Sequence, residues 1–190
     1  MSRGQLEFVE NFVLLNQNNI NMKTNLILIA ISSLFISNAV AQNNSTMKTI
    51  NNNAPVKCSK EISINANKEK VWNVITNINN WSTWQSDISN PKLKGDLVPN
   101  SHFDWKTGGA KIHSTIHTVN LYKEFGWTGK TFGMYAIHNW TINEVNGKII
   151  VSVDESMEGF LAKLLKKGFN KNLEKDMQHW LELLKAECEK

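Results

Sequence analysis

The chain has 190 residues, 41% of them hydrophobic and 20% charged, and a formal net charge of +4 at pH 7. A net charge of this size is ordinary for a protein of this length and does not argue for a nucleic-acid partner. No nucleic-acid-binding motif is present in the sequence either, so that class of function is excluded first.

The first 41 residues are predicted to be an N-terminal extension followed by a cleavable signal peptide. Leu26 to Ile36 is an apolar run of signal-peptide length, too short to cross a bilayer as a helix. Ala39 to Ala41 has the small-x-small cleavage pattern just before Gln42. A buried core helix is the alternative. We expect translation to start at Met22 and the product to be exported, to the periplasm or out of the cell, from a bacterial source.

The exported part is expected to be a flexible leader followed by one domain. Residues 42–55 are polar, rich in asparagine and without periodicity, which predicts a flexible leader. Residues 56–190 are predicted to form a single domain, and no internal repeat divides them.

The first half of this domain predicts a strand, two short helices and then several strands. Val56 to Ala66 alternates and predicts a strand. Asn67 can cap a helix over Lys68 to Asn77, whose apolar residues are helically spaced. Asn79 to Trp84 is predicted to be a loop that leads into a second short helix. Further strands are expected around Pro91, around Phe103 and Trp105, over Ala110 to Val119 and over Glu124 to Lys130.

A β-hairpin is predicted at Asn146-Gly147, which lies between two alternating runs, Met134 to Glu144 and Lys148 to Met157. Both turn residues tolerate the positive φ of a type I′ turn, so this dipeptide is the strongest short-range hairpin signal. A two-residue turn places His138 opposite Glu155 and Trp140 opposite Val153. The sequence thereby predicts an imidazole beside a carboxylate on an otherwise apolar face.

The C-terminal segment changes to helical periodicity. From Phe160 to about Glu187, apolar residues recur at spacings of three and four, with lysines and glutamates between them. One long amphipathic helix is predicted, with Gly168 as its weakest point.

This order of elements resembles the START/SRPBCC superfamily, which includes birch-pollen-allergen-like and polyketide cyclase/dehydrase-like proteins. The resemblance covers nearly all of residues 56–190. It is carried by these motifs in this order: Ile64-Asn65-Ala66, Val71-Trp72, Trp81-Ser82-Thr83-Trp84, Phe103-Asp104-Trp105, Trp127-Thr128-Gly129, Ala136-Ile137-His138-Asn139-Trp140 and Asp154-Glu155-Ser156-Met157-Glu158-Gly159. It implies an α+β helix-grip fold, in which a curved antiparallel sheet wraps around the long C-terminal helix and encloses an apolar cavity.

The predicted cavity wall is aromatic. Strand parity turns one set of apolar side chains inward, against the first turns of the C-terminal helix. Tryptophan suits such a wall because it combines a large apolar surface with one N–H donor. Simple core packing is the alternative for each residue. The predicted ligand-binding residues are Trp84, Phe103, Trp105, Trp127, His138, Trp140, Val153, Glu155, Leu161, Leu165 and Phe169.

His138 and Glu155 are the candidates for chemistry. Such a pair can satisfy its own hydrogen bonds, orient a ligand hydroxyl or carbonyl, or act as a general base on an acidic C–H. No serine or cysteine nucleophile accompanies it in the sequence. All three roles stay open.

A metal site is not expected. His113 and His117 lie in an alternating run, and four residues of strand separate them by about 13 Å. That separation is too large for one zinc ion with bonds near 2 Å, so we predict outward-facing histidines, no metal and no cofactor.

The two cysteines, Cys58 and Cys188, are expected not to be bridged. In the helix-grip fold the last helix ends near the end of the first strand, whereas Cys58 lies near its start, about 20 Å away.

Lysines of the C-terminal helix form a basic ridge, for which a solvated face is the simplest interpretation. Contact with anionic lipid through Lys163, Lys167 and Lys171 is the alternative.

The sequence thus predicts an exported, non-catalytic protein that binds a small hydrophobic or amphipathic ligand, such as a lipid or polyketide, between sheet and helix. The alternative is a cyclase/dehydrase- or isomerase-type enzyme that uses His138 and Glu155 as an acid/base pair. An interaction module without a small ligand is a third possibility.

Overall fold

The computed structural model describes residues 45–190. The predicted extension, signal peptide, start at Met22 and first residues of the leader lie outside the described residues.

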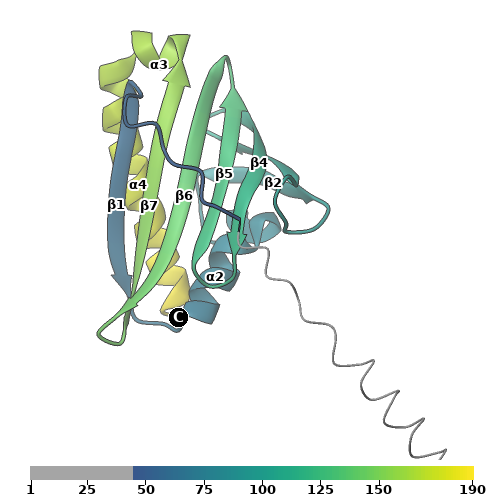
Figure 1. Cartoon of the computed structure of the whole chain (residues 1–190), viewed down its shortest axis with the longest axis vertical. Coiled ribbons are helices and arrows are strands. Elements are labelled where there is room, and N and C mark those ends of the chain that lie inside the picture. Colours follow the sequence, from purple (N-terminus) through teal and green to yellow (C-terminus); the bar gives the residue numbers. More distant parts are fainter. Residues whose placement is uncertain (1–44) are drawn as a thin grey trace, which may run out of the picture. The chain divides into compact units, whose positions relative to one another are not determined.

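A seven-stranded antiparallel sheet forms the body of the domain, with strand order β1-β7-β6-β5-β4-β3-β2 (Figure 1). Each strand pairs with its neighbour in sequence, except that β1 pairs with β7 and not with β2. The strands are β1 (Val56–Ile64), β2 (Ile88–Lys94), β3 (His102–Thr107), β4 (Ala110–Asn120), β5 (Glu124–Thr131), β6 (Met134–Val145) and β7 (Lys148–Gly159).

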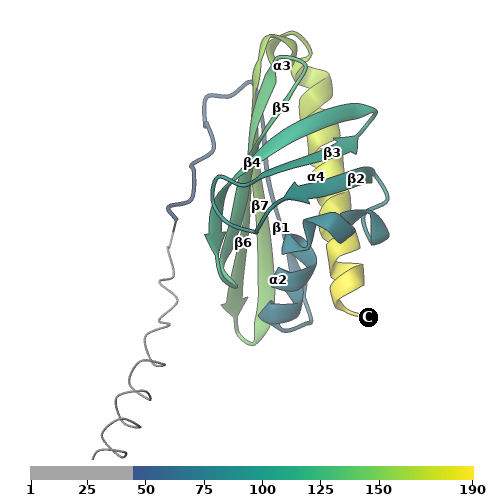
Figure 2. The same cartoon turned by 90° about the vertical axis from the view of Figure 1, so that its right-hand side faces the viewer.

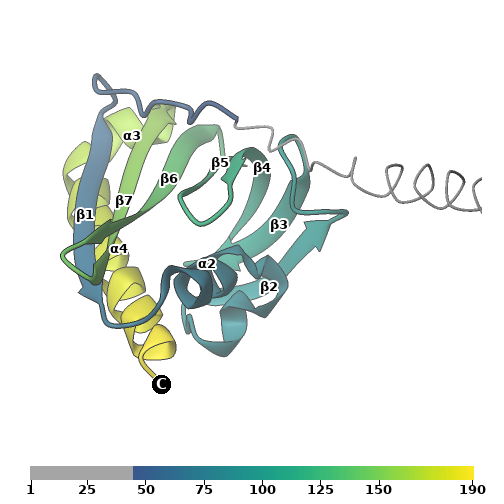
Figure 3. The same cartoon turned by 60° about the horizontal axis from the view of Figure 1, so that its bottom comes forward.

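The helices lie on one face of this sheet. The α-helices are α2 (Lys68–Thr76), α3 (Phe160–Leu164) and α4 (Lys166–Cys188), and η1 (Ile78–Thr83) is a 3-10 helix. Figure 3 shows the sheet as an arc with α2 and α4 on its concave side. This is the predicted α+β helix-grip architecture, and the helix over Lys68 to Asn77 is confirmed, with Asn67 as its cap accepting a hydrogen bond from Lys70 N.

The predicted hairpin is confirmed residue by residue. Asn146 and Gly147 have φ values of 52° and 74°, as a type I′ turn requires. Val145 pairs with Lys148, and the same register places His138 opposite Glu155.

The long C-terminal helix is not continuous, so the prediction of one helix from Phe160 is wrong. Leu165 has φ −104° and ψ 24° and separates α3 from α4. The break falls three residues before Gly168, which lies inside α4. Its physical reason is the change of partner: α3 packs on β7 and β6, whereas α4 packs on β1 and α2. The chain therefore has to turn as it leaves β7.

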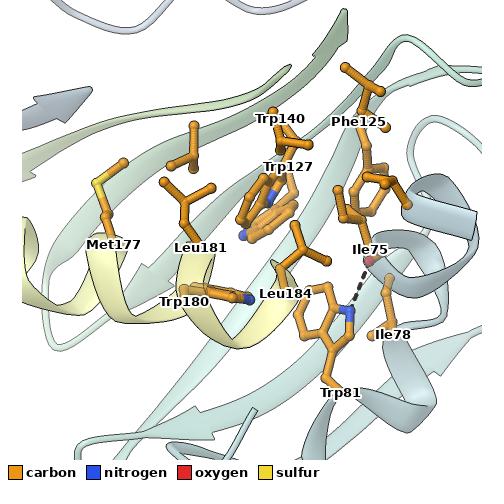
Figure 4. Packing of buried hydrophobic residues seen from close by; sticks show 14 of the residues in the cluster. Ile75, Ile78, Trp81, Phe125, Trp127, Trp140, Met177, Trp180, Leu181 and Leu184 are labelled. Carbon is orange, nitrogen blue, oxygen red and sulfur yellow. Dashed lines mark hydrogen bonds between the residues drawn. The ribbon is translucent and has the colours of Figure 1, made fainter. Parts of the chain in front are cut away.

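Aromatic rings fill the core between the sheet and the helices (Figure 4). Trp81 of η1 is fully buried, and its Nε1 donates to the carbonyl of Ile75 at 2.8 Å. The ring centroid of Trp81 lies 5.5 Å from that of Phe103 and 5.4 Å from that of Trp127. One contiguous aromatic cluster thus joins η1 to β3 and β5. Among residues 45–190, no helix is both long and apolar enough to span a membrane.

Residues 45–55 run along the convex face of the sheet, opposite α4 (Figure 2). The side-chain amide of Asn120 donates to the carbonyl of Ser45 at 2.9 Å, and that of Asn139 donates to the carbonyl of Lys48 at 2.8 Å. Where the sequence predicted a flexible leader, the described part of this segment is held against β4 and β6.

Candidate functional site

A cavity of about 600 Å³ lies between the concave face of the sheet and α4. Ligand pockets in proteins have volumes of about 300–1,000 Å³ and mostly apolar walls. Here the sheet contributes apolar side chains from most of its strands, because alternate residues of each strand point to this face. The apolar lining residues are Trp105, Ile112, Trp127, Met134, Ala136 and Met157 from β3 to β7, Ile88 from β2, and Leu173, Met177 and Trp180 from α4.

His138 and Glu155 form the polar centre of this wall. They face each other on β6 and β7, and His138 Nδ1 lies 2.5 Å from Glu155 Oε2. Both are buried, with exposed fractions of 3% and 8%. Trp127 stacks on the imidazole at a centroid distance of 4.2 Å and an interplanar angle of 16°. The register that the turn imposes therefore brings the pair together, and the indole fixes the plane of the ring.

Two nitrogen atoms of the cavity wall have no hydrogen-bond partner among the described residues. They are His138 Nε2 and Trp180 Nε1, both of them buried. A carboxylate accepts hydrogen bonds, so Glu155 requires the proton on Nδ1, which leaves Nε2 of the neutral ring as an acceptor. The indole N–H of Trp180 can only donate. The ring centroids of these two residues are 5.3 Å apart and both residues line the cavity, so an acceptor and a donor belong to neighbouring side chains of one wall.

The rim of the cavity is polar and partly charged. Asp87, Gly108, Lys175 and Asp176 are exposed and also line the cavity, which therefore opens to the surface between α4 and the turn that joins β3 to β4. Although Asp176 is exposed as a residue, partial desolvation of its carboxyl group, followed by the negative charge of Asp87, raises its pKa.

Four of the predicted ligand-binding residues line the cavity: Trp105, Trp127, His138 and Glu155. Phe103, Trp140 and Val153 are buried, but their side chains pack into the core and do not line the cavity.

The predicted residues of the helical segment and the loop lie elsewhere. Trp84, Leu161 and Phe169 are half-buried outside the cavity lining. The prediction that Leu165 faces the sheet is wrong, because this side chain is 51% exposed. The physical reason is the break at Leu165, which ends the helical phase on which the prediction relied.

The helical side of the cavity is formed by Leu173, Met177 and Trp180, which sequence reasoning did not assign to the site. These residues belong to the apolar stripe that the spacing of three and four identified. The periodicity alone does not distinguish the stretch that faces the cavity from the stretch that fills the core.

The two histidines that were predicted to face outward have separate environments. His113 is exposed, and its Nδ1 lies 2.7 Å from Asp104 Oδ1. His117 falls at an irregularity in the pairing of β4 with β5, where burial and then the charge of Lys48 lower its pKa from 6.5 to about 4. Within residues 45–190 no group of three or more His, Cys, Asp or Glu side chains is arranged to hold a metal ion.

Cys58 and Cys188 are both free thiols. Glu189 Oε1 accepts a hydrogen bond from Asn65 N at 2.7 Å, so the end of α4 lies beside the residue after β1. Cys58 is the third residue of that strand, at its other end.

Solved structures with this fold include several bacterial proteins. A hypothetical protein of Helicobacter pylori superposes with a TM-score of 0.67 at 18% identity, covering 76% of this chain and 98% of that one. A START superfamily protein of Mycobacterium smegmatis gives 0.57 at 13% identity, covering 70% and 97%. The di-domain ARO/CYC protein StfQ from the steffimycin biosynthetic pathway gives 0.61 at 12% identity, covering 70% of this chain and 51% of that one.

The family model described as polyketide cyclase / dehydrase and lipid transport matches residues 55–189. No curated protein matches the chain. The matched span runs from just before β1 to the last residues after α4 and includes every residue that lines the cavity. The chain therefore belongs to the polyketide cyclase / dehydrase and lipid transport family.

Proposed function

We propose that this protein binds a small, largely apolar ligand that carries a hydroxyl group. The observation that carries the proposal is a pair of buried nitrogens without a partner among the described residues, His138 Nε2 and Trp180 Nε1, on side chains of a mostly apolar cavity wall. A hydroxyl oxygen can accept from the indole N–H while its own proton is donated to the imidazole. A carbonyl satisfies only the indole, and a hydrocarbon satisfies neither.

The rest of the cavity supports this ligand class. Its volume of about 600 Å³ suits a molecule of several fused rings or a folded acyl chain. Leaving buried donors and acceptors unpaired costs about 1–3 kcal/mol each, and a ligand hydroxyl removes that cost.

Binding of two matched probes, 2-naphthol and naphthalene, tests the proposal through quenching of tryptophan fluorescence. The wild type is expected to prefer 2-naphthol by about threefold to tenfold, the contribution of one net hydrogen bond. His138→Phe and Trp180→Phe are expected to lose this preference and to retain naphthalene binding.

The matched control is Trp84→Phe, which removes a tryptophan outside the cavity lining and should leave the preference intact. Equal affinity of the wild type for both probes would count against the hydroxyl anchor. A wild type that binds neither probe would count against the cavity as a ligand site.

A second candidate is an enzyme of the cyclase/dehydrase or isomerase type. It is favoured by the dyad itself, because a carboxylate that orients an imidazole in a cavity wall, with the other ring nitrogen unpaired among the described residues, is the arrangement of a general base. The test uses the ligand that co-purifies with the protein from its host, identified by native mass spectrometry. If the protein is an enzyme, His138→Ala would still bind this ligand but would no longer convert it. Loss of binding and conversion together favours the anchoring role.

We also propose that Lys163, Lys167 and Lys171 contact anionic lipid.

We propose in addition that the protein is exported. Export is supported by the apolar run Leu26 to Ile36 and the small-x-small pattern at Ala39 to Ala41. N-terminal sequencing of the protein from its host should start at Gln42. A protein that retains residues 26–41 would contradict the cleavage.

A further inference from the structure

Several large apolar side chains are exposed at one end of the molecule. Phe132 is 72% exposed in the turn between β5 and β6, and Phe160 is 75% exposed at the start of α3. Leu164 and Leu165 follow, at 65% and 51%. Phe160 and Leu164 are four residues apart in α3 and so share one face of the helix. Scattered single apolar residues are normal on protein surfaces, but a contiguous group indicates an interaction site.

The two segments that carry these side chains are in direct contact. Met134 pairs with Gly159 at the ends of β6 and β7. A Cβ atom on Gly159 would lie 2.4 Å from the carbonyl oxygen of Gly133. Figure 1 shows α3 at the same end of the molecule as the turn between β5 and β6. We call Phe132, Phe160, Leu164 and Leu165 together the apolar tip.

The surroundings of the apolar tip are basic. Residues 160–171 contain the lysines Lys163, Lys166, Lys167 and Lys171 and no acidic residue. All four lysines are exposed, and none forms an ion pair with another described residue. A second copy of the chain placed symmetrically on the tip would bring these like charges together, whereas an anionic lipid surface neutralises them.

The apolar tip also adjoins the cavity. Thr131 and Met134 flank the Phe132-Gly133 turn, and both line the cavity. Thr131 Oγ1 donates to the carbonyl of Lys111 at 2.8 Å, which ties this turn to β4 next to the rim residue Gly108. A surface that receives the tip therefore comes close to the cavity opening.

We propose that the apolar tip inserts into the headgroup region of an anionic bilayer, with the surrounding lysines on lipid phosphates. The tip places the cavity beside the membrane, so that an apolar ligand passes between bilayer and cavity over a short path. Docking itself needs no cavity ligand, so it can succeed or fail independently of the hydroxyl anchor.

Hydrogen exchange of the full chain locates the contact. With phosphatidylglycerol vesicles, exchange is expected to slow in residues 130–135 and 159–168, and with phosphatidylcholine vesicles it is not. Phe160→Ser combined with Leu164→Ser should lower the vesicle partition coefficient at least about tenfold. Each of Lys163→Gln, Lys166→Gln and Lys167→Gln should lower it about fivefold.

Leu121→Ser and Val145→Ser are the matched controls, because both residues are exposed apolar side chains away from the tip. Both should partition like the wild type. Exchange that slows at the tip without vesicles as protein concentration rises would assign the tip to a second copy and overturn the proposal. Slowing that is equal on both lipids, or absent from the tip, would overturn it as well. Probe binding measured without vesicles stays unchanged in every tip variant, which separates this test from that of the cavity.

Discussion

His138 and Glu155 are held by their surroundings as much as by each other. Trp127 stacks on the imidazole, and the ring centroids of Trp140 and Trp180 lie 5.5 Å and 5.3 Å from it. Glu155 has its short contact with Nδ1 of this ring. The imidazole therefore has one plane and one orientation, and Nε2 is its ring nitrogen without a partner among the described residues.

Replacing Glu155 by leucine should destabilise the fold, because it leaves the buried Nδ1–H of His138 without an acceptor. We expect the free energy of unfolding to fall by about 1–3 kcal/mol. Glu155→Gln retains an acceptor and should cost less. Urea denaturation measures both, with Glu158→Gln, on the other face of β7, as the control. Equal losses for leucine and glutamine would show that the hydrogen bond does not matter for stability.

His117 should make the fold acid-sensitive. Its pKa is lowered from 6.5 to about 4 by burial and by Lys48, so the unfolded chain binds more protons between those values. The stability contributed by the neutral ring is therefore present above about pH 6.5 and is lost as the pH falls toward 4. Urea midpoints at pH 7 and 4.5 should differ less in His117→Gln than in the wild type. The exposed His113→Gln serves as the control, and identical pH dependence in all three proteins would contradict the prediction.

At the scale of elements, the junction of β7 with α3 is tightly constrained by a glycine. Gly159 has φ 122° and ψ 173°, a conformation that is essentially restricted to glycine. A side chain there would also strike the backbone of the turn between β5 and β6. The position of the apolar tip and the start of the C-terminal helices both depend on this residue.

Two glycines of neighbouring elements should therefore respond in opposite directions to alanine. Gly159→Ala is expected to lower the free energy of unfolding by at least about 1–3 kcal/mol, because of its φ and the Gly133 carbonyl. Gly168→Ala should raise it by about 0.5–1 kcal/mol, because a methyl group on Gly168 would meet no atom within 4 Å and alanine favours the helix. Thermal unfolding of the two variants measures the difference, and a destabilised Gly168→Ala would show that the junction needs flexibility there.

At the scale of the whole molecule, α4 closes the concave side of the sheet from the cavity to the end of β1. Cys188 near its end is 1% exposed, and burial raises its pKa to about 12. Cys58 is half-buried, with its pKa raised, chiefly by burial.

Alkylation should report how this closure opens. With iodoacetamide at pH 8, Cys58 is expected to react first, and Cys188 only when the end of α4 detaches or the chain unfolds. Peptide mass spectrometry gives both rates. Urea concentrations below the unfolding transition should accelerate the alkylation of Cys188 more than that of Cys58. Equal alkylation rates in the folded protein would contradict the burial of Cys188 by the end of α4.

The periodicity of the sequence determined the strands, the helical character of the C-terminal segment and the register of the last hairpin. Asn146-Gly147 requires a two-residue turn, and the spacing of two along a strand then assigns every facing pair, including His138 with Glu155. These are local rules that depend on neighbouring residues. The motifs from Ile64 to Gly159 and the final helical segment were sufficient to predict the family and the fold.

Only the tertiary structure decided which apolar residues line the cavity and which fill the core. Trp140 and Trp127 share one face of the sheet, yet only Trp127 reaches the cavity, because the placement of α4 determines where space remains. The break at Leu165 likewise follows from packing on two different partners, and Phe160, Leu164 and Leu165 beside it are exposed. Periodicity identifies an apolar face, but what covers that face depends on contacts between residues far apart in the chain.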